Sequence, residues 1–536
     1  MRHKKRRRKL WMKRWKENKM RETVSFLMER HSDVMQTGSF WLPSACQNLS
    51  IEYNLKPPAT FLVFFLLKDP EGKLRFQKQL SYSTPIIVLG KSSTDTTIGG
   101  IPGEMMAGEW TIEIYLFSEY LEQIPEGEKL PLVFRISDEK KEVPETIDGD
   151  LWADETFGYS RLNKDRIWKE GTGWYKGDFH THTQLSDGRE LPGEAGKKAQ
   201  KMGLDFYMAT EHNVVHTGWP QTPVLVMPGV EITTIIGHAN VFGLTRRPNH
   251  LTKILRDKDR SLLKKDIRLI LEECREEGWL FSINHPFLHI WKWLYDEISL
   301  SDISCLEIIN DPTYEADPEA DAHEANEKAV FLSDLLWEDG YRICAIGGSD
   351  SHKKEEDWYP GADGPSIPGD PATFLYMEDL SERHVLDALQ RCRSHVSRRC
   401  EITCMLTAQK EDGTLRTVVF GDKLKDGEEE LSYKIIMRGQ KDRPHLYYVR
   451  NGKRQECDCV SQGEDCWTAE GSISLSCEKY QWVRFGAESA QGAFLWYANP
   501  VSKGEKEHRF HTFGEVKGYL EEQWKSKEYY LTKMER

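Results

Sequence analysis

The sequence predicts an α/β protein in which a central unit of alternating strands and helices lies between two β-rich domains. Between residues 174 and 398, short apolar runs alternate with helical stretches, which is typical of parallel strands joined by helices. On both sides of this unit the helical pattern disappears, and short β-rich runs are separated by Gly, Pro and Asp. The length of 536 residues is too great for one ordinary core and predicts two to four domains.

A basic tail, a β-sandwich and a linker are expected before the central unit. The first 21 residues hold 12 lysines and arginines against one acid, Glu17, and we assign residues 1–37 to a basic N-terminal tail. Residues 38–120 are predicted to form the sandwich. Its strand-like runs span residues 49–53, 60–67, 85–89 and 108–115. Residues 121–173 are rich in Glu, Asp, Lys and Pro with weak periodicity, which indicates a linker.

The central unit, residues 174–398, has the repeats that a barrel needs. Its predicted strands span residues 176–180, 206–209, 224–230, 239–242, 280–283, 305–309 and 343–346. Its predicted helices span residues 262–277 and 322–339, and a last strand and helix span 372–377 and 382–393. In the first helix, the spacing of Leu262, Ile267 and Ile270 places them on one apolar face.

A second β-sandwich over residues 399–502 and a helical C-terminal tail over residues 503–536 complete the predicted chain. The strand-like runs span residues 431–437, 446–450, 481–485 and 493–497. The pair Asn451-Gly452 is a strong hairpin signal. Residues 515–536 are amphipathic and charged, which predicts one terminal helix packed on the body.

Composition and charge exclude several classes of protein. The longest apolar run, residues 61–67, is far shorter than the roughly 20 residues of a membrane-spanning helix. The net charge is −13 despite the basic tail, so the body is acidic and a large nucleic-acid interface is not expected. The tail leaves nucleic-acid binding open, beside a solvated extension or a start placed too far upstream. The odd number of 11 scattered cysteines fits reduced thiols, and we expect a cytoplasmic protein.

Histidines and carboxylates gather where the predicted strands end. His180 and His182 close the first strand, and because they are two residues apart in extended chain they point to the same side. Further metal-capable side chains follow at or beside later strands: Asp187, His212, Glu231, His238, His285, Asp350 and His352. The carboxyl ends of parallel strands meet at one face, so these side chains should lie together. Without cations, so many metal-capable side chains would repel one another or remain unpaired, which predicts a multinuclear metal centre.

The motifs that carry these residues have a familiar order. They read Asp178-Phe179-His180-Thr181-His182, Ser186-Asp187-Gly188, Glu211-His212-Asn213, Gly229-Val230-Glu231, Gly237-His238, Asn284-His285-Pro286 and Gly348-Ser349-Asp350-Ser351-His352. On the basis of these motifs, residues 177–352 resemble the PHP (polymerase and histidinol phosphatase) superfamily of metal-dependent hydrolases. The fourth and fifth motifs, together with the flanking domains, look most like its carbaryl hydrolase branch. The resemblance implies a distorted (β/α)7, TIM-like barrel between the two sandwiches.

The resemblance also implies a ligand set. One metal would be held by His180, His182, Glu231 and Asp350. A second would be held by Glu231, His238 and His285, with Glu231 as the bridge, and a third by Asp187, His212 and His352. Two or three divalent ions are expected, Mn, Zn or Fe, and the first set would also be the catalytic residues. Glu211 stands where many family members have Asp and is not a matched ligand.

These residues predict a hydrolase. A bridging carboxylate holds two cations close together, and a water shared between them loses a proton near neutral pH. We therefore predict a metal-bound hydroxide that cleaves a phosphoester, or a carbamate, amide or ester bond, of a small molecule. Two alternatives stay open: a PHP-type nuclease acting on DNA or RNA, and a non-catalytic binding protein that contains metal. No oligomeric state is predicted.

Several neighbours of the motifs allow two interpretations. His216 and His289 are candidates to protonate a leaving group, or are core or solvated histidines. Trp291, Trp293 and Tyr295 either wall a pocket for an apolar or aromatic substrate or serve ordinary packing.

Overall fold

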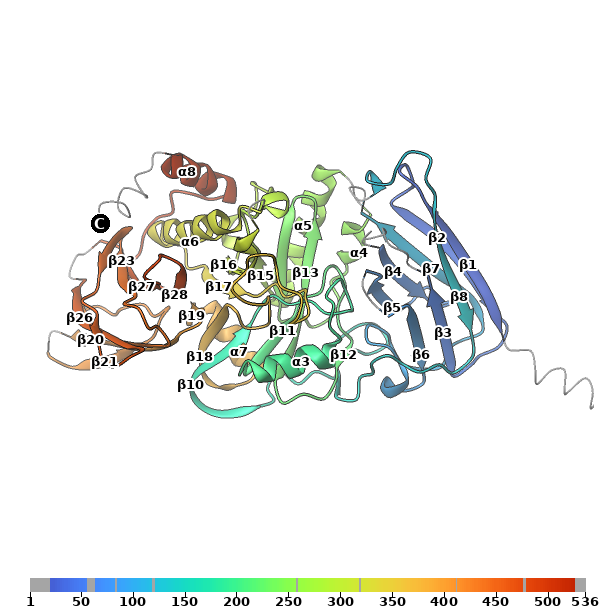
Figure 1. The fold of residues 1–536 in the computed structure, drawn as a ribbon, viewed down its shortest axis with the longest axis horizontal. Coiled ribbons are helices and arrows are strands. Elements are labelled where there is room, and N and C mark those ends of the chain that lie inside the picture. Colours follow the sequence, from blue (N-terminus) through green and yellow to red (C-terminus); the bar gives the residue numbers. More distant parts are fainter. Residues whose placement is uncertain are drawn as a thin grey trace, which may run out of the picture.

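The fold was obtained as a computed structural model, and it is an α/β arrangement with far more strand than helix (Figure 1). It describes residues 20–54, 63–81, 84–117, 121–256, 259–317, 320–410, 412–475 and 479–525. Along the longest axis, the N-terminal sheets, the central unit and the C-terminal strands follow one another (Figure 1). Within the described ranges, every helix is too short or too polar to cross a lipid bilayer.

Two four-stranded antiparallel sheets form the N-terminal part. The first has the order β1 (Arg21–Met28), β8 (Leu130–Ser137), β3 (Asn48–Tyr53) and β6 (Ile86–Gly90). The second has the order β2 (Met35–Leu42), β7 (Gly108–Leu116), β4 (Val63–Lys68) and β5 (Leu74–Gln79). The sheets share one apolar core, in which the rings of Phe65 on β4 and Phe134 on β8 lie 5.0 Å apart.

Two of these strands occupy segments for which the sequence predicted no β structure. β1 lies inside the predicted basic tail of residues 1–37, of which residues 1–19 are outside the described residues. β8 lies inside the predicted linker of residues 121–173. Both strands alternate buried apolar with exposed side chains, as Phe134 and Arg135 do on β8, but charged neighbours hide this short pattern. β structure therefore extends beyond residues 38–120 at both ends.

A single 14-stranded sheet runs through the central and C-terminal parts. Its central strands are β17 (Cys344–Gly348), β16 (Cys305–Asn310), β15 (Leu280–Ile283), β14 (Gly237–Phe242), β13 (Leu225–Thr234), β11 (Phe206–Ala209), β10 (Lys169–Asp178), β18 (Ala372–Leu380) and β19 (Ser394–Ser397), in spatial order. A strand therefore lies at each place predicted between residues 176 and 346. The strands are not all parallel, because β14 runs antiparallel to both β13 and β15 and so joins two parallel sets.

The end strand β17 bends back to the middle of this sheet. The Gly347 N–H donates to Thr373 Oγ1 on β18 over 2.9 Å, and the same hydroxyl donates to the Gly347 carbonyl over 2.8 Å. A Cβ at Gly347 would lie 2.6 Å from a methyl carbon of Val396, so only glycine permits this approach. The curved sheet is thus joined here by side chains instead of a backbone ladder.

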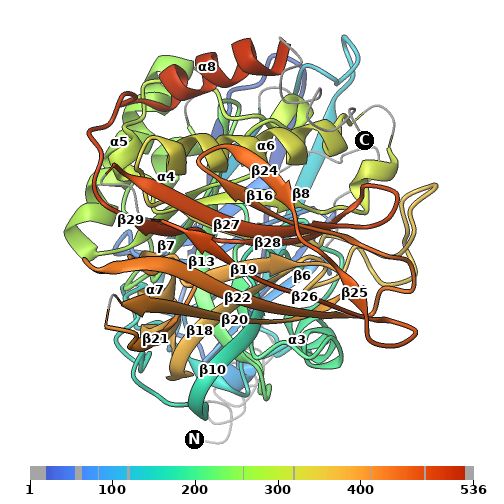
Figure 2. The ribbon, with the colours of Figure 1, turned by 90° about the vertical axis from the view of Figure 1, so that its left-hand side faces the viewer.

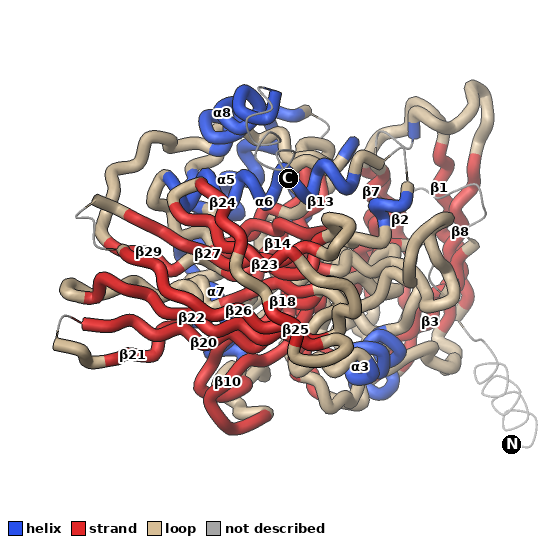
Figure 3. Tube along the Cα trace, turned by 60° about the vertical axis from the view of Figure 1, so that its left-hand side comes forward, coloured by secondary structure: helices blue, strands red, loops and turns tan. Residues whose placement is uncertain are grey.

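Helices cover the strands on two sides. They are α3 (Pro192–Lys201), α4 (Leu251–Ile254), α5 (Arg260–Glu277), α6 (Ala322–Glu338), α7 (Glu382–Gln390) and α8 (Phe513–Lys525). α5, α6 and α8 gather on one side of the strands and α3 lies on the other (Figure 3). α5 begins after Asp259, whose carboxylate caps the helix, and ends at Gly278 with φ 72°. Ile267 and Ile270 are buried as predicted, whereas Leu262 is 47% exposed and its neighbour Leu263 is buried instead.

The C-terminal part holds two groups of strands around one core. A five-stranded sheet has the order β21 (Leu415–Val418), β20 (Glu401–Lys410), β22 (Glu428–Arg438), β26 (Cys466–Ser474) and β25 (Val460–Ser461). The large sheet contributes β28 (Phe494–Ala498), β27 (Gln481–Glu488), β23 (His445–Arg450), β24 (Lys453–Glu456) and β29 (Val501–Lys503). Asn451 and Gly452 join β23 to β24 with positive φ at both residues, as a two-residue hairpin requires.

Helix α6 connects the central unit to this C-terminal part. It lies between α8 and strand β27 (Figure 2). Asp334 on α6 accepts two hydrogen bonds from the buried guanidinium of Arg484 on β27, over 2.5 and 2.7 Å. The predicted terminal helix of residues 515–536 begins two residues earlier in α8, and residues 526–536 lie outside the described residues.

The Asp334–Arg484 pair should stabilise the fold because both partners are buried. Asp334→Ala should lower the free energy of unfolding by about 3 to 5 kcal/mol, since it leaves the guanidinium without a counter-charge. Urea unfolding followed by fluorescence measures this. Glu297→Ala, which removes the exposed partner of Lys264, should change it by less than about 1 kcal/mol. Equal changes in the free energy of unfolding in the two variants would contradict the stabilising role of the Asp334–Arg484 pair.

Candidate metal centre

All nine side chains named from the sequence as ligands lie in one cluster. They form four overlapping groups whose ligand atoms lie within 4.8 Å of one another. The groups are His182, Asp187, His212 and His352; His180, His182 and Glu231; His180, His285 and Asp350; and His212, Glu231 and His238. Asp187, Asp350 and His352 are partly exposed, and the others are buried. The cluster therefore has one side that opens outward.

Backbone pairing between two distant segments positions the first ligands. The Asp350 N–H donates to the His180 carbonyl over 2.8 Å, and the His182 N–H donates to the Ser351 carbonyl over 3.3 Å. These bonds hold the segment after β10 against the segment after β17. Asp350 and His285 have φ values of 47° and 26°, in the left-handed region that residues other than glycine seldom adopt. Such strain is concentrated at functional sites in proteins.

Glu231 on β13 lies at the centre of the cluster and is fully buried. Its Oε1 is 3.1 Å from His180 Nε2 and 3.3 Å from His238 Nδ1. Its Oε2 is 2.6 Å from His212 Nδ1. The Asn284 amide donates to Oε1 over 2.9 Å and fixes the carboxylate. Because its two oxygens face different histidines, this carboxylate is suited to bridge two cations.

The two aspartates each face a pair of imidazoles. Asp350 Oδ1 lies 3.0 Å from His182 Nε2 and 3.3 Å from His180 Nε2. Asp187 Oδ1 lies 3.2 Å from His352 Nε2 and 3.4 Å from His212 Nε2. Carboxylate oxygens and imidazole nitrogens therefore alternate around the cluster, which is the donor set of Zn, Mn and Fe sites.

Several atoms of the cluster are buried without a hydrogen-bond partner. They are His180 Nε2, both ring nitrogens of His182, Asp187 Oδ1, His285 Nδ1 and Asp350 Oδ1. An unsatisfied buried polar atom costs about 1 to 3 kcal/mol, so a protein seldom retains this many in one place. Divalent cations would satisfy them, and the residues present fit that group of ligands.

Burial and nearby carboxylates shift the pKa values of several histidines of the cluster in opposite directions. Burial lowers the pKa of His182 and of His238 to about 4, so both offer neutral nitrogens. Burial also opposes a charge on His352, but Asp187 and Asp350 outweigh it and raise the pKa of His352 to about 10. In the absence of a cation, His352 is therefore protonated at neutral pH.

A buried carboxylate that the sequence argument missed orients this cluster. Glu307 on β16 places Oε1 2.9 Å from His180 Nδ1, and its Oε2 accepts the His285 N–H over 2.8 Å. The first contact puts the proton of His180 on Nδ1 and leaves Nε2 facing the cluster. The available signal was an acid in the middle of an otherwise apolar strand, Cys305-Leu306-Glu307-Ile308-Ile309.

Glu211 faces away from the cluster and organises the loop that carries Asp187. Its carboxylate accepts from the N–H groups of Thr183 and Ser186 over 3.0 and 3.2 Å. It also lies 2.8 Å from His216 Nε2. His216 is therefore engaged in the core.

The other candidates near the motifs differ in their surroundings. His289 is exposed, and it is not among the residues that line the cavity over the cluster. Trp291 lines that cavity, whereas Trp293 and Tyr295 are buried in the core of the central unit. Of the three aromatic residues considered, one is thus placed to meet a substrate.

A cavity of about 560 Å³ opens from the exposed side of the cluster. Six of the cluster residues line it: Asp187, His212, His238, His285, Asp350 and His352. Asp311 also lines it, and burial raises the pKa of Asp311 to about 7 against the hydrogen bonds that it accepts from Thr313. The size is that of a small-molecule site.

Comparison with known proteins adds little to this geometry. No family model matches the chain, and no curated protein matches it. One solved structure that it resembles is a two-domain protein from Bacteroides vulgatus containing a predicted PHP-like metal-dependent phosphoesterase, with 18% identity and a TM-score of 0.32. The match covers 64% of this chain and 100% of that one. This level of similarity supports no inference about fold or function.

Metal binding should release protons, because a cation must displace the proton that His352 carries at neutral pH. We expect affinity for Zn or Mn to rise between pH 6 and pH 8, by about tenfold per pH unit for each displaced proton. Calorimetric titration in buffers of different ionisation enthalpy measures the number released. An affinity independent of pH would contradict the protonation assigned to His352.

Glu307→Gln should weaken metal binding by about 10- to 100-fold, because His180 loses the carboxylate that orients its ring. Metal content after dialysis against a chelator series measures this. Glu470→Gln, a change of the same kind at a 77% exposed carboxylate, serves as the control. Unaltered affinity in Glu307→Gln would show that Glu307 has no part in the site.

Proposed function

We propose that this protein is a metal-dependent hydrolase of the PHP type. The observation that carries the proposal is the cluster of converging, partly unsatisfied imidazole and carboxylate atoms beneath a cavity of small-molecule size. Two or three divalent ions, Mn, Zn or Fe, fit its donors. The curved part of the large sheet would correspond to a distorted TIM-like barrel, flanked by two β-sandwich domains, in a cytoplasmic protein.

The ligands are proposed to divide into three sets. The sets are His180, His182, Glu231 and Asp350; Glu231, His238 and His285; and Asp187, His212 and His352. The central position of Glu231 supports its role as the bridge between the first two. When bound, divalent ions lower the pKa of a coordinated water and polarise the scissile bond. The first set is proposed to be catalytic.

The remaining groups of the site prepare the reaction. Glu307 holds the ring of His180, and Asn284 holds the carboxylate of Glu231, so both point into the cluster before substrate arrives. Asp311 has a pKa near neutrality and lines the cavity, so it is placed to give a proton to a leaving group. No serine or cysteine nucleophile is required.

The proposed substrate is a small molecule with a phosphoester, or a carbamate, amide or ester bond. None of the described residues that line the cavity is a lysine or arginine. A binding site for a nucleic-acid strand relies on such cations along the backbone. The cavity therefore favours a small substrate over the nuclease alternative.

His182→Ala and Asp350→Ala should each lower kcat/KM by about a thousandfold or more, because each removes a proposed ligand. The measurement is Mn- and Zn-dependent turnover of a phosphomonoester, a phosphodiester, a carboxylic ester and an aryl carbamate. His31→Ala, at an exposed histidine of the N-terminal part, should retain full activity. Circular dichroism verifies the fold of each variant. Full turnover by folded His182→Ala would contradict the metal assignment.

A further inference from the structure

Beyond the metal ligands, much of the cavity wall is apolar or aromatic. Its lining there includes six apolar or aromatic side chains: Phe117, Ile235, Ile290, Trp291, Tyr314 and Tyr359. Ligand sites are typically lined in this way, with a few polar groups that fix orientation. The two ends of the cavity therefore differ in chemistry.

Three aromatic rings form a continuous row on this region. The ring centres of Trp291 and Tyr314 lie 6.3 Å apart, and those of Tyr314 and Tyr359 lie 5.0 Å apart. The ammonium of Lys353 lies 3.2 Å from the centre of the Tyr359 ring and is engaged with that aromatic face. The row offers flat surfaces on which another ring can stack.

Ile290 is unusually exposed for its size. It is 66% exposed, the highest value among the large apolar side chains in the described part of the chain. A single exposed apolar residue is ordinary on a surface, but Ile290 lines the cavity above a cluster of metal-capable residues. An apolar ligand that covered it would remove that side chain from water.

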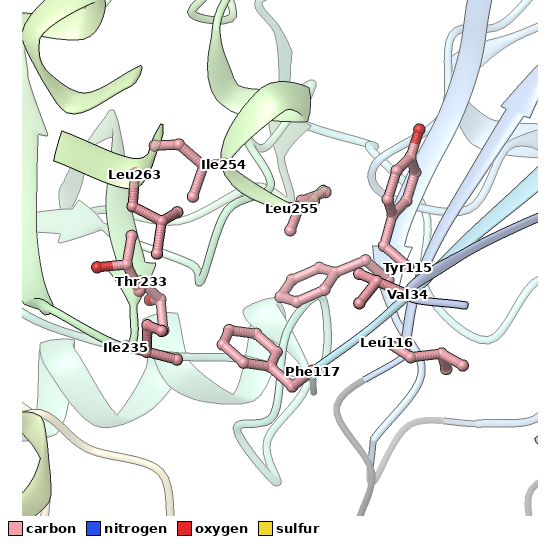
Figure 4. A pocket seen from close by; sticks show the side chains of 11 residues that line it. Val34, Tyr115, Leu116, Phe117, Thr233, Ile235, Ile254, Leu255 and Leu263 are labelled. Atoms are coloured by element: carbon pink, nitrogen blue, oxygen red, sulfur yellow. The ribbon is translucent and has the colours of Figure 1, made fainter. Parts of the chain in front are cut away.

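The N-terminal part of the chain supplies another part of the wall. Phe117 directly follows β7, and Ile235 lies in the turn between β13 and β14, the strands that carry Glu231 and His238. Figure 4 shows Phe117 next to Ile235 and Thr233 across the boundary between the two parts. These residues line both the main cavity and the small apolar cavity of that figure. The N-terminal sheets thus help to shape the substrate site.

We infer that this region binds an uncharged aromatic or similarly flat apolar group of the substrate, with Phe117 and Ile290 as specificity-determining residues. The inference rests on the proposed function for the reacting end of the cavity. The described lining holds no lysine or arginine, and the nearby ammonium of Lys353 is engaged with the Tyr359 ring, so the region favours a neutral group over an anion. A volume of about 560 Å³ accommodates one or two rings together with the reacting group.

Benzyl alcohol is a suitable probe, because it is neutral, carries one ring and has no bond to hydrolyse. Calorimetry on the metal-loaded full chain should detect its binding, and ethanol should bind far more weakly. Phe117→Ala and Ile290→Ser should each raise the Kd of benzyl alcohol by about fivefold or more, as expected for a lost apolar contact. Trp41→Ala, at a 61% exposed aromatic of the same N-terminal sheets, should leave it unchanged.

Metal content of each variant, measured in parallel, verifies that the cluster is intact. The exposure of Ile290 makes Ile290→Ser safe for folding even if Phe117→Ala unfolds. Equal Kd values for wild type and both variants, or equal binding of benzyl alcohol and ethanol, would overturn the inference. If both variants bind the probe more weakly but the protein hydrolyses no substrate, the apolar site stands and the proposed function is refuted. If the protein hydrolyses phenyl acetate and both variants keep the wild-type KM, the proposed function stands and the apolar site is refuted.

Discussion

The buried carboxylate of Glu231 imposes the constraint on which the centre of this structure depends. An isolated carboxylate with no exposed surface is strongly destabilising, so the chain must surround it with compensating groups. Imidazoles of His180, His212 and His238 and the amide of Asn284 do so, and they come from four different strand ends or turns. Satisfying this one charge therefore brings distant segments of the central unit together.

The curved sheet makes that convergence possible. Parallel sets on either side of the antiparallel β14 deliver their carboxyl ends to one face, and the return of β17 towards β18 adds Asp350 and His352. Backbone hydrogen bonds between the segments that follow β10 and β17 then fix the positions of these two segments relative to one another. His180, His182 and Asp350 are therefore placed by backbone bonds as well as by side-chain contacts.

Much of the centre could be predicted from sequence because its residues lie at strand ends in recognisable local motifs. His180 and His182 share a face because they are two residues apart in extended chain, which is a local property of the sequence. The end of α5 at Gly278 is also local, because glycine favours the backbone conformation that ends a helix. Glu307 was missed because only tertiary packing shows that a single acid in a strand faces His180. Phe117 gave no signal at all, since its place beside Ile235 depends on how the N-terminal sheets pack on the central unit. β1 and β8 were hidden by charge around a short alternation.

The seam between β17 and β18 has a consequence for how two residues of the cluster are held in place. Thr373 bonds the Gly347 backbone there, and Ser394 and Asn499 bond the Ala345 backbone, so side chains take the place of a ladder of backbone bonds. Asp350 and His352 follow β17, so the position of this strand determines where both residues lie. Two residues of the cluster thus depend for their position on side chains that are not ligands themselves.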